Sequence, residues 1–260
     1  MYIYSIILLC LLVSSSVQSC ILRYQNEFAI SLESPVNLST NNKKIIIKNK
    51  KNIYQFNESK TLKLIDKTND ILISSEYISQ VNSSDLNTQL EKFIAHQDDI
   101  SFVGSVENND MIYLVGHNGI QNTLFEFNKS DLIDFDNANR FVNVTTYDIL
   151  TPSYDGVGAL VSDLAINPLN NTLYVSSFIP INKSNKQEYI NYVAPIHLDY
   201  IHFRRDIGMY FEAKDIQKEN KNQKIESIAV LPIEGDITGL YLSMTDNKGS
   251  SRILKYQLLD

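Results

Sequence analysis

Residues 162–178 read SDLAINPLNNTLYVSSF, and this stretch decides the fold class. An apolar run at 164–166 is followed by an Asn-rich segment at 167–171. From residue 172 to residue 178, apolar side chains alternate with their neighbours. Two extended segments around turn-forming residues predict an antiparallel β-hairpin.

Groups of short strand-like segments, separated by turn residues, recur along the chain at a spacing of about 60 to 67 residues. Besides the hairpin, which continues into a third segment at 192–198, they lie at 45–48, 53–56 and 61–65; at 100–104, 111–115 and 123–127; and at 225–232, 239–243 and 252–258. Residues 21–24 and 27–32 predict a further strand pair, residues 35–42 a loop, and residues 218–224 a solvated loop. Leucine and phenylalanine at helical spacing predict one short helix at 85–95.

A repeat of three or four short strands predicts an all-β, β-propeller-like fold with four to six blades. A single small sheet cannot bury its own faces, whereas sheets packed around an axis bury them and protect their edges. The alternative is a β-sandwich whose strands resemble one another by chance.

The first nineteen residues have the pattern of a signal peptide, so we expect residues 20–260 to form a single exported domain. The apolar run at 6–13 has the length of a signal core, and Val17 and Ser19 occupy the small-residue positions of a cleavage site. No later run approaches the length of a membrane span. Cleavage leaves Cys20, which is open to three interpretations: an inert terminal residue, an intermolecular disulfide or a lipidated cysteine.

Asn-x-Ser/Thr sequons support a eukaryotic secretory route, since such asparagines accept N-linked glycans on exposed loops. Several fall where turns are expected, so the glycan and turn interpretations agree. The predicted glycosylation sites are Asn37, Asn57, Asn82, Asn128, Asn143, Asn170 and Asn182.

Charge and motifs exclude several classes of protein. The net charge of -7 argues against a nucleic-acid protein, because phosphate binding needs a concentrated basic surface. The sequence has no nucleophile elbow, P-loop, His-Glu-x-x-His motif or zinc-binding cysteine pair. These observations favour a non-catalytic protein and predict no catalytic residue and no dedicated metal site.

Carboxylates at the starts of the predicted innermost strands are the candidate ligand-binding residues. In a propeller these positions line the central channel, where several blades converge on one ligand. They are Asp98, Asp99, Asp163 and Glu226. Such a set could hold an amine or a divalent cation such as Ca²⁺. The alternative is that these side chains cap turns or face solvent.

Residues 163–174, read as DLAINPLNNTLY, resemble propeller repeats of the NHL and SMP-30/gluconolactonase types. Together with Asp155-Gly156 and residues 189–203, they are also similar to the yellow/major royal jelly family. The second resemblance implies a secreted, non-catalytic glycoprotein, some of whose relatives bind small amines in the channel. The chain is shorter than that six-bladed family and lacks its disulfide cysteines. The SMP-30 resemblance implies a metal-dependent lactonase, but its metal-ligand motifs have no counterpart here residue by residue.

The sequence therefore predicts a secreted, N-glycosylated, propeller-like protein that binds a small ligand or an extracellular protein without catalysis. One alternative is a metal-dependent hydrolase or lactonase of SMP-30 type working from the channel. Another is an extracellular adhesion module, which would present an exposed apolar patch outside the channel.

Overall fold

The computed structural model is built almost entirely from β-strands, which confirms the predicted all-β class. The chain has 260 residues. The structure describes residues 21–30, 37–41, 44–48, 52–57, 61–67, 100–128, 130, 144–183, 186–201, 206–208, 222–232 and 237–259. The predicted signal peptide, the helix expected at 85–95 and the sequons that begin at Asn57, Asn82, Asn128, Asn143 and Asn182 lie wholly or partly outside these ranges.

A three-stranded antiparallel sheet at the centre of the molecule contains the hairpin that the sequence predicts. Its strands are β12 (Leu160–Asn167), β13 (Thr172–Lys183) and β14 (Lys186–His197). The turn between β12 and β13 ends at Asn171, whose φ of 51° is one that asparagine tolerates better than most residues. The predicted hairpin is confirmed, and both later strands extend beyond the hydrophobic pattern.

A second sheet has the order β15-β9-β8-β7-β6, and its pairs are antiparallel except for β15 with β9. Its strands are β6 (Ser101–Asn108), β7 (Met111–His117), β8 (Asn122–Asn128), β9 (Thr145–Leu150) and β15 (Asp206–Gly208).

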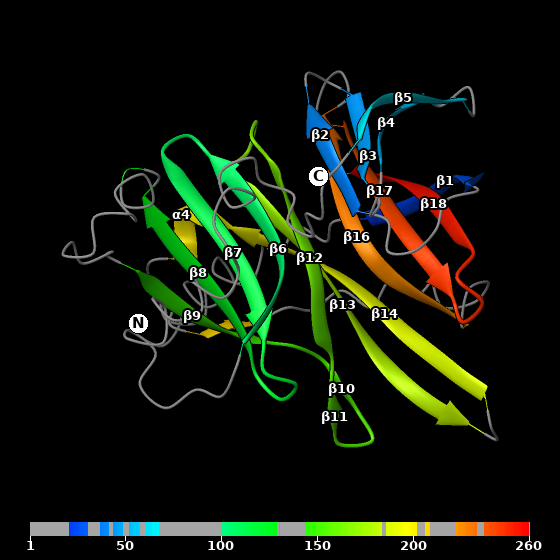
Figure 1. Cartoon of the computed structure of the whole chain (residues 1–260). Helices are drawn as coiled ribbons and strands as arrows, with labels where there is room; N and C mark the ends of the chain where they lie inside the picture. The colour runs from blue at the N-terminus through cyan, green and yellow to red at the C-terminus, as the bar shows by residue number, and fades with distance from the viewer. Residues whose placement is uncertain are drawn as a thin grey trace, which may run out of the picture.

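The third sheet brings the two ends of the chain together, in the order β1-β18-β17-β16. Its strands are β16 (Gln223–Pro232), β17 (Ile237–Asp246), β18 (Ser251–Leu259) and β1 (Ile21–Ile30). Figure 1 shows β1 in blue beside the red C-terminal strand. The predicted strand pair at 21–24 and 27–32 is therefore wrong: this segment is one strand with a bulge between Tyr24 and Asn26, paired with β18.

The fourth sheet is an antiparallel meander in the order β2-β3-β4-β5. Its strands are β2 (Asn37–Asn41), β3 (Lys44–Lys48), β4 (Asn52–Asn57) and β5 (Thr61–Lys67). The last three strands match the prediction. The loop predicted at 35–42 is wrong at residues 37–41, which form β2 and pair with β3.

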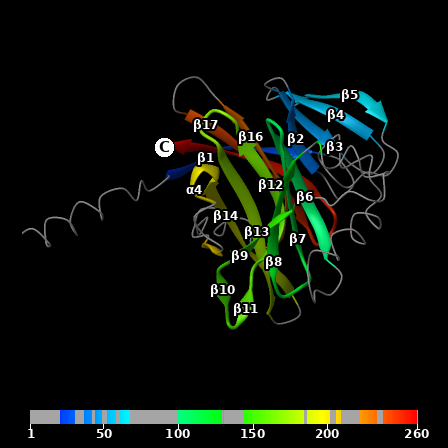
Figure 2. The ribbon, with the colours of Figure 1, turned by 90° about the vertical axis from the view of Figure 1, so that its left-hand side faces the viewer.

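The four sheets pack against one another through one edge strand each. These edge strands, which we call the first strands, contact one another in the order β6, β12, β16, β2. Figures 1 and 2 show these strands side by side in both views. Each neighbouring pair of sheets encloses an apolar core. The cores centre on Val175 and Leu124, on Tyr174 and Leu242, and on Phe28 and Ile47. Because β12 lies between two of these cores, its residues from Val161 to Asn167 are all buried.

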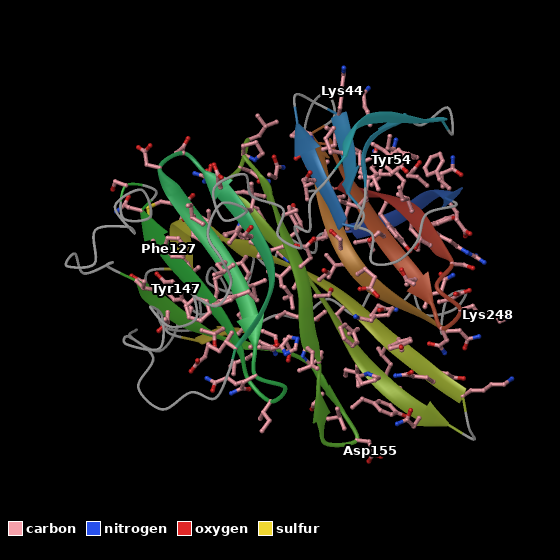
Figure 3. All side chains as sticks on the ribbon, in the orientation of Figure 1. Lys44, Tyr54, Phe127, Tyr147, Asp155 and Lys248 are labelled. Carbon is pink, nitrogen blue, oxygen red and sulfur yellow. The ribbon has the colours of Figure 1, made fainter. Side chains whose placement is uncertain are left out.

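Two small elements complete the described chain. A hairpin of β10 (Ser153–Tyr154) and β11 (Val157–Gly158) projects from the end of the molecule, with Asp155 at its tip (Figure 3). Asp155 and Gly156 both have positive φ, as a tight two-residue hairpin turn requires. A single helical turn, α4 (Leu198–Ile201), follows β14. No helix among the described residues is long and apolar enough to cross a membrane.

Candidate functional site

Three of the contacting first strands are bulged at corresponding positions. Their registers shift between Phe102 and Gly104 in β6, between Val161 and Asp163 in β12, and between Ile225 and Ser227 in β16. A bulge adds one residue to a strand and re-aims the side chains beside it. Directly after the bulges come Gly104, Asp163 and Ser227.

Asp163 joins sheets through its carboxylate. Oδ1 accepts a hydrogen bond from its neighbour Leu164 N at 2.8 Å, whereas Oδ2 accepts one from Ile228 N in β16 at 3.1 Å. Ser227 Oγ donates a further hydrogen bond to Oδ2. Ser227 Oγ also accepts from Leu38 N in β2 at 2.8 Å. We call this chain from β12 through β16 to β2 the Asp163 seam.

The environment of Asp163 favours the neutral carboxyl. Burial raises the pKa of Asp163 to about 7, although the hydrogen bonds from Ser227, Ile228 and Leu164 act in the opposite direction. The side chain is 4% exposed. The ionised carboxylate is stabilised by these hydrogen bonds, and no cation among the described residues is paired with it.

Gly104 brings β6 against the same carboxylate. A Cβ at this position would collide with Asp163 Oδ1 and lie 2.9 Å from both Asp163 Cα and Leu164 N. Since two of these atoms belong to the backbone, the strands would have to move apart to accept it. The glycine is thus required by the close approach of β6 to β12.

We expect Gly104→Ala to lower the free energy of unfolding by about 1–3 kcal/mol, as overpacking of a closely packed interior does. Gly158→Ala is the matched control, because a Cβ there meets only Thr151 Oγ1 at 3.9 Å. Urea unfolding of both variants measures the difference. Equal stability of the two variants would contradict the close approach.

Two buried asparagines fasten neighbouring sheets in the same way. Asn122 of β8 donates from Nδ2 to Ala159 O at 2.8 Å and accepts from Val161 N at 3.0 Å. Asn191 of β14 donates to Gln223 O at 2.9 Å and accepts from Ile225 N at 3.0 Å. In both cases one side-chain amide binds the C=O of one residue and the N–H of the residue two positions later, where the first strand of the next sheet begins. We call these the asparagine clamps.

A second pair of inter-sheet contacts starts from the ends of first strands. Asn108 Nδ2, at the end of β6, contacts Asn171 Oδ1 beside β13 at 3.3 Å. Asn167 Nδ2, at the end of β12, donates to Thr238 Oγ1 in β17 at 2.9 Å. Neighbouring sheets thus repeat both their packing and their polar contacts.

Glu226 belongs to a different group, near the residues at which the first strands begin. We call this group the Lys224 cluster; its members are Lys224, Glu226, Phe178, Tyr189 and His117. The Lys224 ammonium lies 3.3 Å from Glu226 Oε2 and 4.6 Å from the centre of the Phe178 ring. Tyr189 packs edge-on against Phe178. Burial raises the pKa of Tyr189, and the Glu226 charge raises it further. Burial lowers the pKa of His117 below its ordinary value, and the Lys224 charge adds to this effect.

A buried carboxylate that the sequence did not single out lies in the β6–β9 sheet. Glu126 accepts a hydrogen bond from Tyr147 OH at 2.8 Å, and its residue is 5% exposed. Tyr147 is labelled within this sheet in Figure 3. Burial first, and the charge of Glu126 second, raise the pKa of Tyr113 to about 12.

The structure separates the predicted candidates. Asp163 is buried in the seam, whereas Glu226 is partly exposed and paired with Lys224. Asp98 and Asp99 lie outside the described residues. Among the described residues, no group of three or more His, Cys, Asp or Glu side chains is placed to hold a metal ion.

Sequence reasoning missed Ser227, the asparagine clamps and Lys224. A signal for the clamps was present, because Asn122 and Asn191 sit at comparable places in successive strand groups. Lys224 was assigned to a solvated loop at 218–224. That assignment is wrong at its end, because β16 begins at Gln223.

Comparisons with known proteins add little to this geometry. No protein-family model matches the chain, and no curated protein matches it either. Among solved structures, it is similar to a chain of the complex of S. cerevisiae Dbp5 bound to Nup159, Gle1, IP6 and ADP. That similarity has 11% identity and a TM-score of 0.28, and it covers 87% of this chain and 66%, less than two thirds, of the other.

Proposed function

We propose that the chain is a secreted, N-glycosylated, propeller-like protein that binds a small ligand or an extracellular protein without catalysis. The observation that carries the proposal is that buried polar side chains and partly exposed ones have different roles. The buried ones, Asp163, Asn122 and Asn191, are engaged in joining sheets. Partly exposed polar and aromatic groups gather instead in the Lys224 cluster, where a partner can reach them.

The propeller-like arrangement is supported by the repeated relation between sheets. First strands contact in succession, an apolar core fills each interface, and the asparagine clamps recur. The N-terminal strand also completes the sheet that the C-terminal strand belongs to. A closed ring would be completed between β2 and β6. Residues 68–99, which lie between β5 and β6 in the sequence, are outside the described residues, so the number of blades stays a prediction.

Three of the predicted glycan acceptors suit the proposed secretory route. Asn128, Asn170 and Asn182 are exposed, and Asn170 lies in the turn between β12 and β13. Asn37 and Asn57 lie at strand ends, in β2 and β4. Exposed acceptors next to turns can carry sugar without disturbing the cores.

Expression in a eukaryotic secretory host tests the route. We expect the chain in the medium, with a mass that falls on treatment with an N-glycosidase. Asn170→Gln should remove one glycan and leave secretion intact, because its side chain is exposed. Retention of an unmodified chain inside the cell would contradict the proposal.

Binding itself can be tested at the Lys224 cluster by NMR. Titration with primary amines should shift the signals of Phe178, Tyr189 and Glu226, and Glu226→Gln should weaken the response. The metal-dependent hydrolase is tested in parallel by calorimetric titration with Ca²⁺. Stoichiometric Ca²⁺ binding that Glu226→Gln abolishes would favour the hydrolase.

A further inference from the structure

The Asp163 seam contains one hydroxyl proton and two acceptors for it. Ser227 Oγ lies against Asp163 Oδ2 in β12 and 3.4 Å from Leu38 O in β2. Ser227 Oγ also accepts a hydrogen bond from Leu38 N, whichever of the two oxygens its own proton faces. Its own proton can satisfy only one of the two oxygens at a time.

We propose that Asp163 and Ser227 form a proton-controlled hydrogen-bond switch that links three sheets. When Asp163 is ionised, the Ser227 hydroxyl donates to its carboxylate, and Leu38 O loses that donor. When Asp163 takes up a proton from solvent, the carboxyl donates to Ser227 Oγ. The Ser227 hydroxyl then turns to Leu38 O, so that the hydrogen bonds between β12 and β2 reverse their donor direction.

The surroundings make this exchange sensitive to one proton. The groups that donate hydrogen bonds to Asp163 from neighbouring strands are neutral: the Ser227 hydroxyl and the Ile228 N–H on β16, and the Ser176 hydroxyl on β13, which donates to the Asp163 carbonyl oxygen. Gly104 of β6 lies directly against Asp163, and Leu38 of β2 contacts Ser227. The charged residue next in sequence on β16, Glu226, is paired with Lys224. An ionised Asp163 therefore has no compensating cation among these groups.

The direction of the pH effect follows from the raised pKa. The carboxyl has a pKa of about 7 in the folded chain and an ordinary value of 3.8 when exposed. Between these values the folded state holds a proton that the unfolded state releases. Stability should therefore fall as pH rises through this window, with the unfolding constant rising about tenfold per pH unit in its middle. Above the window the effect is complete.

Two measurements on the full chain test the switch. The ¹³Cγ signal of Asp163 should titrate near pH 7. The amide signal of Leu38 should move with the same midpoint as Asp163. Ser227→Ala should uncouple them, because it removes the hydroxyl that relays the change.

Unfolding curves at pH 5 and pH 7.5 provide the second measurement. The loss of stability between the two values should be smaller in Asp163→Asn than in the wild type, and Asp155→Asn should retain the wild-type loss. Burial and the Lys224 charge lower the pKa of His117, but His117 is common to all variants and its contribution cancels in the comparison. A midpoint for Asp163 below pH 5, or a Leu38 amide that ignores it, would overturn the proposal even if Asp163→Asn fails to fold. The switch does not rest on the proposed binding function.

Discussion

Replacing both asparagine clamps by alanine is expected to destabilise the chain more than any surface change. Each single variant, Asn122→Ala or Asn191→Ala, leaves one buried N–H and one buried C=O without its partner. An unsatisfied buried polar group costs about 1–3 kcal/mol, so the two in each variant should cost about 2–6 kcal/mol together. The two clamps lie in different interfaces, and the losses should add. A total of about 4–12 kcal/mol is comparable with the whole stability of many domains.

Asn247→Ala is the matched control for the clamps. Its amide makes the same kinds of contact, donating to Gln187 O at 3.1 Å and accepting from Tyr189 OH at 3.3 Å, but it is exposed. Water can replace the lost partners there, so a change within about 0.5 kcal/mol is expected. Urea unfolding of the single variants, and protease sensitivity of the double variant, measure the effects. Clamp variants as stable as Asn247→Ala would show that the amides do not hold the sheets together.

The parts of the fold that the sequence predicted are those fixed by local pattern. The β12–β13 hairpin needs only an apolar segment, a turn that ends at Asn171 and a second alternating segment. Its partner strands follow directly in the chain. The same holds for β3, β4 and β5, whose turns are only a few residues long.

Long-range pairing could not be predicted in this way. Ile21 pairs with Leu259 at the other end of the chain, and no local pattern specifies that partner. The polar residues at 25–26 looked like a turn within a hairpin. In the structure they belong to one strand, with a bulge after Tyr24 and a hydrogen bond from Gln25 to Gln257.

The candidate site shows a similar limit. Asp163 was predicted at the start of an innermost strand, but it lies in the middle of β12, and its partners Ser227 and Ile228 follow 64 and 65 residues later. Which sheet covers the carboxylate depends on packing that composition does not reveal. The clamps were hidden for another reason. In a chain rich in asparagine, two that bridge sheets look the same as those that form turns.

The association of the chain ends leads to the second large effect. Phe28 of β1 is 2% exposed, and its ring packs edge-on against Phe56 of β4 with centroids 5.1 Å apart. It shares a core with Tyr241 and Ile253 of the C-terminal sheet. One side chain from the N-terminal strand thus helps to close the interface between two sheets.

Phe28→Ala should lower the free energy of unfolding by about 3–5 kcal/mol, because it removes a buried ring and leaves a cavity. Gln25→Ala, on the exposed side of the same strand, should change it by no more than about 0.5 kcal/mol. Phe28→Leu should fall between them, since it fills part of the cavity. If β1 were an accessory strand laid on a core that is complete without it, Phe28→Ala would unfold at the same urea concentration as Gln25→Ala. A large loss for Phe28→Ala alone means that the interface between the third and fourth sheets depends on the N-terminal strand.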